Sequence, residues 1–254
     1  MDVLEIVAVV VWAFLVSLVG GVVGLVLGNL RLPLMLVFAS SPAAGAGANV
    51  AVSGAAAVAS ASRHARAGRL NWRLFAWMAP ASLVGAVAGG LVSGVVPDKP
   101  LLIAIGTVVL YGAWEIYRYE RPNRGGGSTG SAGRSALLWN AALIGLVVGL
   151  LGGFVGLILG SMRLPALVRF AGVSPHAAVG TNAAVGVLVG VGGLLGHLPS
   201  GIDWDLFAAG CAGGVPGAYL GAQFTGRLSE RALLNACAAV LVLSGLGILV
   251  QAFV

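Results

Sequence analysis

The segment GLVLGNLRLP at residues 24–33 recurs as GLILGSMRLP at residues 156–165, which lie 132 positions further along the chain. With one inserted residue, the same register aligns Asn49 with Asn182. Chance similarity between apolar segments would not align arginine, proline and asparagine in this way. The sequence therefore predicts an internal duplication and two structurally equivalent halves.

The composition is that of a membrane protein. Of the 254 residues, 59% are hydrophobic and only 9% are charged, whereas a soluble domain has about 25% charged residues. The net charge of +6 comes mostly from arginines in short loops between apolar segments, where such residues set topology. These features exclude a soluble enzyme and a nucleic-acid-binding domain, and they make the lipid bilayer an expected partner.

Apolar stretches of membrane-spanning length predict an all-α polytopic fold with about eight long helices. Two further apolar stretches, 32–40 and 164–172, are too short to span a bilayer. Each follows an arginine, has proline in its first turn and ends before a Ser-Pro step. We therefore expect half-helices with N-termini at Pro33 and Pro165, each followed by a serine-capped helix. The long stretches are 3–28, 43–62, 74–96, 100–117, 136–159, 176–196, 205–226 and 231–253.

Residues 121–135, RPNRGGGSTGSAGRS, form a long polar stretch that is rich in glycine and serine. This composition is typical of a flexible linker. The chain is therefore predicted to have a first membrane repeat at 1–120, a cytoplasmic linker at 121–135 and a second membrane repeat at 136–254.

The charged loops predict that the two repeats have opposite orientations. Arg63, Arg66, Arg69 and Arg73 mark the loop after the second long stretch as cytoplasmic. The equivalent loop of the second repeat, 197–205, has no lysine or arginine and carries two aspartates. Inverted repeats must each cross the membrane an odd number of times, which a re-entrant hairpin followed by three spans provides. The alternative is eight plain spans with parallel repeats.

Arg31 and Arg163 occupy equivalent positions at the two helix breaks. An arginine in hydrocarbon costs about 2.5–3.5 kcal/mol on insertion scales, and such residues mostly face a polar cavity. In one interpretation both side chains extend to opposite membrane interfaces. In the other they lie near the midplane, where the N-termini of half-helices add positive dipole ends, so that the combination attracts an anion.

Polar residues near these breaks complete the candidate substrate-binding set. Asn49, Thr181 and Asn182 lie about 10 Å into their helices, where they either form interhelical hydrogen bonds or donate to the same anion. Asn29 and Ser161 precede the two arginines by two residues.

Small residues at helical spacing predict close helix packing rather than binding. His64 ends one such face beside a loop, so we expect it at the membrane interface. The faces are formed by Ser53, Ala57 and Ser60 and by Gly85, Gly89, Gly213, Gly217 and Gly221.

The sequence has no cluster of His, Cys, Asp and Glu, no serine–histidine pair and no phosphate-binding loop. We therefore expect no catalytic residue, no metal and no cofactor. Cys211 and Cys237 lie in apolar segments without CxxC spacing, which predicts buried apolar side chains.

The second half resembles the TauE/SafE family of sulfite-exporter-type permeases, and the resemblance extends over nearly the whole chain. The resemblance implies a multi-pass inner-membrane protein with duplicated halves that moves small sulfur-containing or organic anions. It also implies that Pro33, Pro165, Thr181 and the two matching asparagines, Asn49 and Asn182, surround the substrate. The landmarks are Leu164-Pro165, GVSPHAAVGTN at 172–182, IDW at 202–204, PGAYLGA at 216–222 and LSER at 228–231.

The chain departs from the family pattern at both breaks. Family members usually have glycines before a Leu-Val-Pro step, whereas this chain has arginine at both positions. They also have Gly-Thr-Ser after the second helix start, where this chain has asparagine in both halves. Arginine at both breaks fits a more strongly bound or more highly charged anion than the family pattern implies, so the substrate need not be the one that the sulfite exporters carry.

The function predicted from the sequence is secondary transport of small anions, such as sulfite or sulfoacetate, by alternating access in the export direction. The alternatives are a passive anion channel and a membrane scaffold that transports nothing. A proton or sodium ion is the expected coupling ion, and the small-residue faces permit a homodimer. No enzymatic activity and no nucleic-acid partner are expected.

Overall fold

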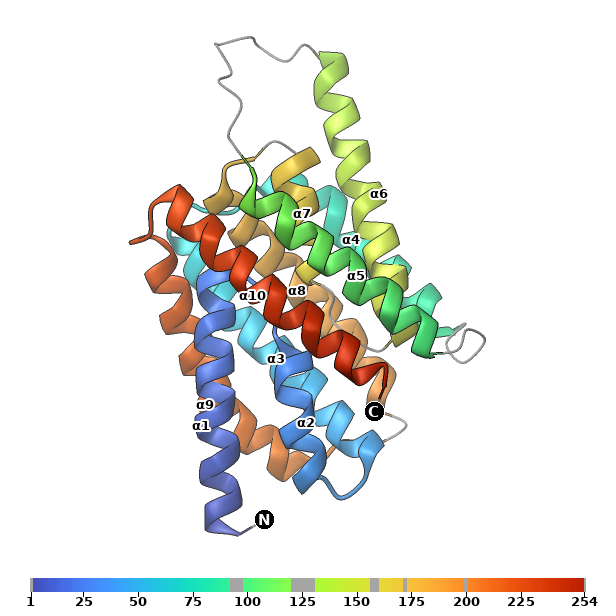
Figure 1. Cartoon of the computed structure of the whole chain (residues 1–254), viewed down its shortest axis with the longest axis vertical. Coiled ribbons are helices and arrows are strands. Elements are labelled where there is room, and N and C mark those ends of the chain that lie inside the picture. The colour runs from blue at the N-terminus through green and yellow to red at the C-terminus, as the bar shows by residue number, and fades with distance from the viewer. Residues whose placement is uncertain are drawn as a thin grey trace.

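A computed structural model describes residues 2–91, 98–119, 131–155, 160–170, 173–198 and 201–253. Within these ranges the chain forms ten helices and no strand, in agreement with the predicted all-α class (Figure 1). The helices are α1 (Val3–Val23), α2 (Gly28–Phe38), α3 (Pro42–Arg66), α4 (Trp72–Leu91), α5 (Asp98–Tyr117), α6 (Ser131–Val155), α7 (Gly160–Phe170), α8 (Pro175–His197), α9 (Trp204–Thr225) and α10 (Glu230–Gln251).

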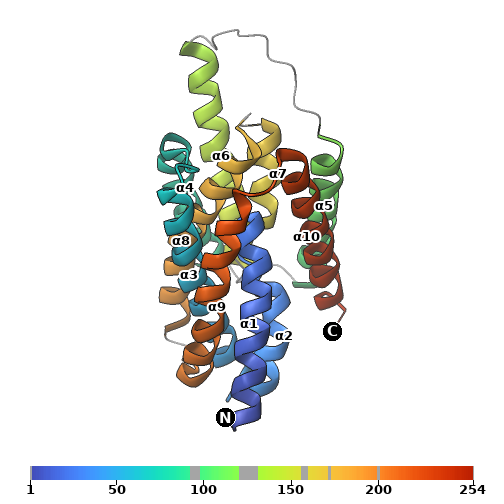
Figure 2. The same cartoon turned by 90° about the vertical axis from the view of Figure 1, so that its left-hand side faces the viewer.

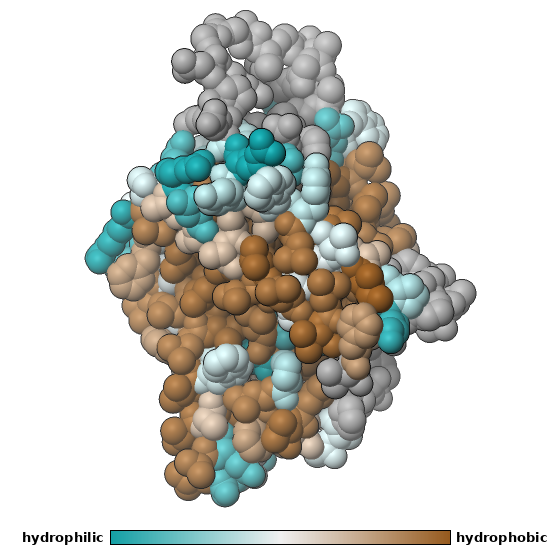
Figure 3. All heavy atoms as spheres, in the orientation of Figure 1, coloured by the Kyte–Doolittle hydropathy of each residue, from teal (hydrophilic) through white to brown (hydrophobic). Residues whose placement is uncertain are grey.

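Several helices have the length and composition of membrane spans. In the described part of the chain four helices qualify, namely Val3–Val23, Ala44–Arg66, Pro175–Leu195 and Glu230–Gln251. In Figure 3, apolar side chains cover most of the middle of the visible face, and polar side chains gather toward its upper and lower ends. This distribution is that of a helical membrane protein.

Helices from the two predicted repeats interdigitate instead of forming separate bodies. In both views α1 lies beside α9 and α5 lies beside α10 (Figures 1 and 2). On the other side of the molecule α4 packs against α6, and in the centre α3 contacts both α8 and α9. Each of these contacts joins a helix before the linker to a helix after it.

Glycines allow the closest of these helix contacts. A Cβ atom at Gly213, Gly217 or Gly221 of α9 would overlap the backbone of α1, and one at Gly85 of α4 would overlap the carbonyl oxygen of Leu146 in α6. The predicted packing role of these four glycines is thus confirmed.

We expect Gly217→Ala to lower the stability of the fold by about 1–3 kcal/mol, because the added methyl group would overlap the Phe14 carbonyl oxygen. The matched control is Gly54→Ala in α3, where a Cβ atom meets its nearest neighbours at an ordinary 3.6 Å. Thermal unfolding in detergent compares the two. Equal melting temperatures for both variants would show that α1 and α9 are not in close contact.

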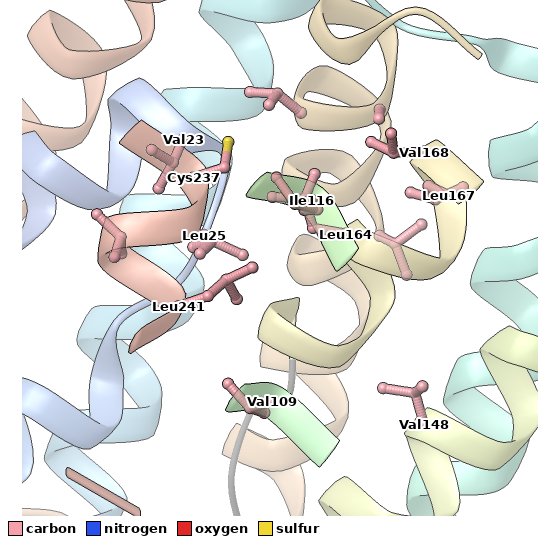
Figure 4. Packing of buried hydrophobic residues seen from close by; sticks show 14 of the residues in the cluster. Val23, Leu25, Val109, Ile116, Val148, Leu164, Leu167, Val168, Cys237 and Leu241 are labelled. Carbon is pink, nitrogen blue, oxygen red and sulfur yellow. The ribbon is translucent and has the colours of Figure 1, made fainter. Parts of the chain in front are cut away.

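The largest apolar core among the described residues joins α1, α4, α5, α6, α7, α8 and α10, and Figure 4 shows part of it around α10, α5 and α7. Leu241 of α10 packs near Leu25, while Ile116 of α5 packs near Leu164 of α7. Cys237 belongs to this core and is 2% exposed, as predicted, whereas Cys211 is only partly buried. This core fixes α7 and the chain segment between α1 and α2, which carry the residues described below.

The two short helices begin earlier than the sequence predicted. The expected span 3–28 ends at Val23, because Gly24 adopts the left-handed conformation with φ +64° and terminates α1. Residues 25–27 are not helical, and α2 then begins at Gly28, as α7 begins at Gly160. The prediction that the N-termini lie at Pro33 and Pro165 is therefore wrong.

Both prolines lie inside the short helices, where each removes one helical hydrogen bond. In α2 the carbonyl group left without its usual partner is that of Asn29, and Gln251 Nε2 of α10 donates to it at 3.3 Å. A hydrogen bond from another helix thus replaces the one that the proline removes. Rules for helix starts use only neighbouring residues, so they do not predict such a contact.

The predicted serine caps are confirmed. Ser41 Oγ accepts a hydrogen bond from the backbone of Ala44 at 3.2 Å, and Ser174 Oγ accepts one from Ala177 at 3.3 Å. Residues 121–130 of the predicted linker lie outside the described residues, but α6 already begins at Ser131. The helix thus includes the last part of the polar stretch.

Candidate functional site

Arg31 and Arg163 lie inside the protein, with 2% and 1% of their surfaces exposed. Each is the fourth residue of its short helix, α2 or α7. Because the helices begin at Gly28 and Gly160, both guanidinium groups belong to the first turns, where the helix dipole is positive.

The guanidinium group of Arg31 is held by oxygen atoms of α1 and α3. Its Nε donates to Asn49 Oδ1 at 3.0 Å, and Nη2 donates to the Asn49 carbonyl at 3.1 Å and to Ser53 Oγ. Nη1 donates to Ser17 Oγ at 3.4 Å. These bonds fix the orientation of the planar group.

Asn49 connects Arg31 to the start of α2. Its Nδ2 donates to the carbonyl oxygen of Gly28 at 3.1 Å, which leaves Oδ1 directed at the guanidinium group. Glycine favours this contact, because a Cβ atom on Gly28 would approach Asn49 Nδ2 to 3.2 Å and Ser53 Oγ to 2.9 Å, so both side chains would have to shift. The amide therefore orients the arginine and satisfies a backbone carbonyl at the same time.

The same arrangement recurs in the second half. Arg163 Nε donates to Asn182 Oδ1 at 3.2 Å, and Asn182 Nδ2 donates to the Gly160 carbonyl at 3.2 Å. Asn182 Nδ2 also donates to the carbonyl of Gly24 at 2.8 Å. That contact attaches α8 to the non-helical segment that follows α1, so one asparagine connects the two halves.

The two arginines differ in their hydroxyl contacts. The aligned position for Ser53 is Gly186 and that for Ser17 is Gly149, so neither hydroxyl group that holds Arg31 is repeated at the aligned position of the second half. The arginine–asparagine pair thus occurs in both predicted repeats, whereas the hydroxyl groups of Ser17 and Ser53 have glycine at the aligned positions.

A small cavity lies beside Arg31. It is lined by Ser17, Ser60 and residues 24–27, together with small residues of α3, α8 and α9. Its space suffices for about one water molecule, so this conformation is closed around the arginine.

The electrostatics of the site are positive. Arginine stays charged in proteins, and the hydrogen-bond partners of Arg31 and Arg163 within the described residues are hydroxyl, amide and carbonyl oxygen atoms, none of them a carboxylate. A buried charge without an opposite charge costs free energy. An anionic ligand would remove that cost, so the arrangement is suited to binding one.

The other predicted site residues have partners other than the two guanidinium groups. Asn29 Nδ2 donates to Ser244 Oγ of α10 at 2.9 Å, and Ser161 is buried. Thr181 Oγ1 accepts from the backbone of Asn71 at 3.0 Å and so holds the loop before α4. Pro33 is exposed.

Pro165 is half-buried and packs where Gly112 of α5 leaves room for its ring. Each proline therefore belongs to the interior of its short helix. It lies on a different face of that helix from the buried arginine, two residues earlier in the sequence. Among the predicted residues, the structure brings each arginine together with its asparagine.

Sequence reasoning assigned Ser53 and Ser60 to packing and did not single out Ser17. Ser53 follows Asn49 by four residues, so helical periodicity could have placed both beside the same arginine. Ser17 is a lone serine in an apolar helix, and only the fold brings it to Arg31.

His64 was expected at the membrane interface, but its side chain is completely buried. Its Nδ1 lies 3.2 Å from Nη1 of Arg69, which also donates to the Ala222 carbonyl of α9 at 2.7 Å. Desolvation lowers the pKa of Arg69 below its ordinary value, and the nearby charge of Arg63 lowers it further. The side chain of His197 lies outside the described set.

These observations define a class: a helical membrane protein with two buried arginines in the first turns of two short helices. A comparison with protein-family models identifies the family of the chain. Residues 9–248 match the model described as "Sulfite exporter TauE/SafE". The chain belongs to this family, which consists of membrane transporters and not of enzymes. Searches of the curated proteins and of the solved structures gave no match.

Proposed function

We propose that this protein is a secondary transporter of small anions, sulfite, sulfoacetate or a related oxyanion, which it exports across the cell inner membrane by alternating access. The observation that carries the proposal is the pair of buried arginines whose described partners are all neutral. Family membership supports transport in general, and the arginines support an anion as its substrate.

The proposed architecture is two repeats of inverted topology. Equivalent helices make equivalent contacts across the two halves: α1 contacts α9 as α6 contacts α4, and α3 contacts α9 as α8 contacts α4. Within each half, α2 contacts α3 as α7 contacts α8. A two-fold relation between the halves accounts for this pattern. In the proposal, α1 with α2 and α6 with α7 form the two re-entrant hairpins, while α3–α5 and α8–α10 give each repeat three full spans and so an odd number of crossings. The eight long helices are then α1, α3–α6 and α8–α10.

The position of two loops supports the inversion. Asp203 accepts a hydrogen bond from Ser40 and donates one to Ala44, at the N-terminal end of α3. Arg69 contacts His64 near the C-terminal end of the same helix. The arginine-rich loop and its acidic counterpart thus lie at opposite ends of α3, as the charge distribution requires for inverted repeats.

In this proposal Arg31 and Arg163 bind the anion, and Asn49 and Asn182 position them. The first turns of α2 and α7 contribute the positive ends of two helix dipoles. Asn29, Ser161, Thr181, Pro33 and Pro165 form the surrounding shell that sets the shape of the short helices. Because the cavity is narrow, an oxyanion is admitted only when the two halves separate on one side, which is the essence of alternating access.

Flux measurements on proteoliposomes test the proposal. The panel is sulfite, sulfate, sulfoacetate, taurine and carboxylates, each with and without a proton or sodium gradient. Saturable uptake of a small anion that depends on one gradient is expected of a secondary transporter. Flux that neither saturates nor depends on a gradient would favour a passive channel, and the absence of any anion flux would favour a scaffold.

Sulfoacetate and taurine form a matched pair for testing the charge of the site. Both carry a sulfonate, but sulfoacetate adds a carboxylate, whereas taurine adds an ammonium group, which would lie near two guanidinium groups without a carboxylate among their described partners. We expect taurine to compete with labelled sulfite about tenfold more weakly than sulfoacetate, or 1.4 kcal/mol. Equal competition would mean that an acidic residue faces the substrate.

A further inference from the structure

Arg69, in the loop between α3 and α4, joins helices of both halves. Its Nη1 donates to the Ala222 carbonyl of α9 at 2.7 Å and lies 3.2 Å from Nδ1 of His64 in α3. Because Nη1 can only donate, Nδ1 is the acceptor, and the other ring nitrogen has the backbone carbonyl of Gly21 in α1 as its partner. One arginine thus connects α3 with α9 and, through the histidine, with α1.

Two glycines of the second half allow Arg69 to lie this close to α8 and α9. A Cβ atom on Gly180 of α8 would lie 2.5 Å from the Arg69 carbonyl oxygen. A Cβ atom on Gly226, which ends α9, would lie 2.5 Å from Nη2 of the guanidinium group. Neither glycine has the left-handed backbone that would itself favour glycine. The space that Arg69 occupies therefore accounts for both residues.

A second contact attaches the same loop to α8. The backbone N–H of Asn71 donates to Thr181 Oγ1 at 3.0 Å, while Asn71 Oδ1 accepts from the Leu74 backbone and caps α4. The residue 132 positions further along is Asp203, which caps α9 in the same way. Its backbone N–H donates to the Ala44 carbonyl of α3 at 3.2 Å. Each of the two aligned loops is therefore attached to a helix of the other half.

The Arg69 contacts lie between the arginine-rich loop and the small cavity described above. Ser60 of α3 and Ala218 of α9 line that cavity. One helical turn further along, the same two helices carry His64 and Ala222, which Arg69 joins. The side chain of His64 is 0% exposed, so this layer of the protein is tightly packed.

We propose that the loop of residues 67–71 is a gate on the side of the arginine-rich loop and that Arg69 is its latch. The inference rests on the proposed transport, because an anion from this side reaches Arg31 only after the loop separates from α8 and α9. In the structure the latch is closed, and the space beside Arg31 suffices for about one water molecule.

Opening this gate breaks two hydrogen bonds between the halves. These are the bond from Arg69 to Ala222 and the bond from Asn71 to Thr181. Water replaces each of them, so the free-energy cost of opening is moderate. The contacts of Asp203 with the start of α3 stay closed meanwhile, because alternating access opens one side at a time.

The test is side-specific labelling of a cysteine placed in the cavity by Ser60→Cys, with Cys211 and Cys237 changed to alanine. The probe is sulfonatoethyl methanethiosulfonate, an anionic thiol reagent that does not cross membranes. It is added to vesicles of either orientation, and the modified protein is measured by mass spectrometry. Labelling is expected to be slow while the gate is closed, because the cavity is too small for the reagent.

Two variants release the latch by different routes. Arg69→Ala removes the guanidinium group, whereas Gly226→Ala keeps it and displaces its end with a methyl group. Gly226 has φ −73°, which alanine adopts freely, and the displaced atoms end a flexible side chain, so the melting temperature is expected to stay the same. Both variants are expected to raise the labelling rate about tenfold, from the arginine-rich side alone, through the lost hydrogen bond of a charged group. The matched control is Arg66→Ala, because Arg66 is exposed at the end of α3.

The labelling requires no transported anion, so it separates the latch from the proposed function. Equal labelling rates in Gly226→Ala and Arg66→Ala would overturn the latch, as would faster labelling from the opposite side. Saturable sulfite flux together with such equal rates would leave transport standing without this latch. The expected labelling in a protein that shows no anion flux would support the latch and overturn the proposed anion transport.

Discussion

Replacing Arg31 or Arg163 with glutamine is expected to raise the KM for sulfite about a hundredfold. Each charge-assisted hydrogen bond contributes roughly 1.5–3 kcal/mol, and a bidentate contact with an oxyanion has two. Glutamine keeps a polar side chain but removes the positive charge. Flux into proteoliposomes as a function of sulfite concentration measures the change.

Thermal unfolding of the same variants separates binding from folding. Glutamine removes a buried charge that has only neutral partners among the described residues, so the melting temperature is expected to stay the same or rise. The control is Arg227→Gln, because Arg227 is exposed and lies over the ring of Phe224 at 5.2 Å. An unchanged KM in both arginine variants would remove these residues from the substrate site.

Asn49→Leu is expected to destabilise the protein by about 3 kcal/mol. The leucine leaves Arg31 Nε and the Gly28 carbonyl without their described partner, although it has a similar volume. The Arg31→Met change alone is expected to be mild, because it removes the buried charge. The double variant, Arg31→Met with Asn49→Leu, should regain most of the lost stability, since no buried charge is then left unpaired.

A double-mutant cycle measured by thermal unfolding in detergent quantifies this coupling. The structure requires strongly non-additive effects, with the double variant more stable than Asn49→Leu. Additive losses would mean that Asn49 stabilises α3 independently of Arg31. The equivalent cycle for Arg163 and Asn182 includes the contact of Asn182 with Gly24, so its double variant should recover less.

Much of the helical organisation could be predicted from the sequence because it depends on local patterns. Apolar runs located the helices, and Ser41 and Ser174 marked two helix starts through their caps. The repeated Arg-Leu-Pro step indicated that each half contains a short helix, α2 or α7, but not the residue at which that helix begins. Composition and the landmarks of the second half indicated the family that the family-model match confirms.

The remaining features depend on contacts between distant segments. Pro33 suggested a helix start, but α2 begins at Gly28 because the left-handed Gly24 ends α1 and Gln251 satisfies the carbonyl freed by the proline. The orientation of Asn182 depends on Gly24, which is 158 residues away in the sequence. Patterns in neighbouring residues cannot predict such contacts.

The candidate site also has features that local patterns predict and features that depend on contacts between distant segments. The sequence indicated which arginines and asparagines belong together, because duplication placed them in register. It did not indicate that Asn49 positions Arg31 through Gly28, or that Ser17 of α1 reaches the same guanidinium group. The hydroxyl groups around Arg31 are absent from the aligned positions of the second half, so the repeat itself gave no hint of them.

The most direct test of the central claim is sulfite counterflow in proteoliposomes. Vesicles loaded with a high concentration of unlabelled sulfite are diluted into a trace of labelled sulfite. The account predicts a transient accumulation of label above its equilibrium level, which an alternating-access carrier produces and a channel does not, and predicts its loss in Arg31→Gln. Label that only equilibrates, at the same rate in wild type and variant, would contradict a carrier built around the buried arginines.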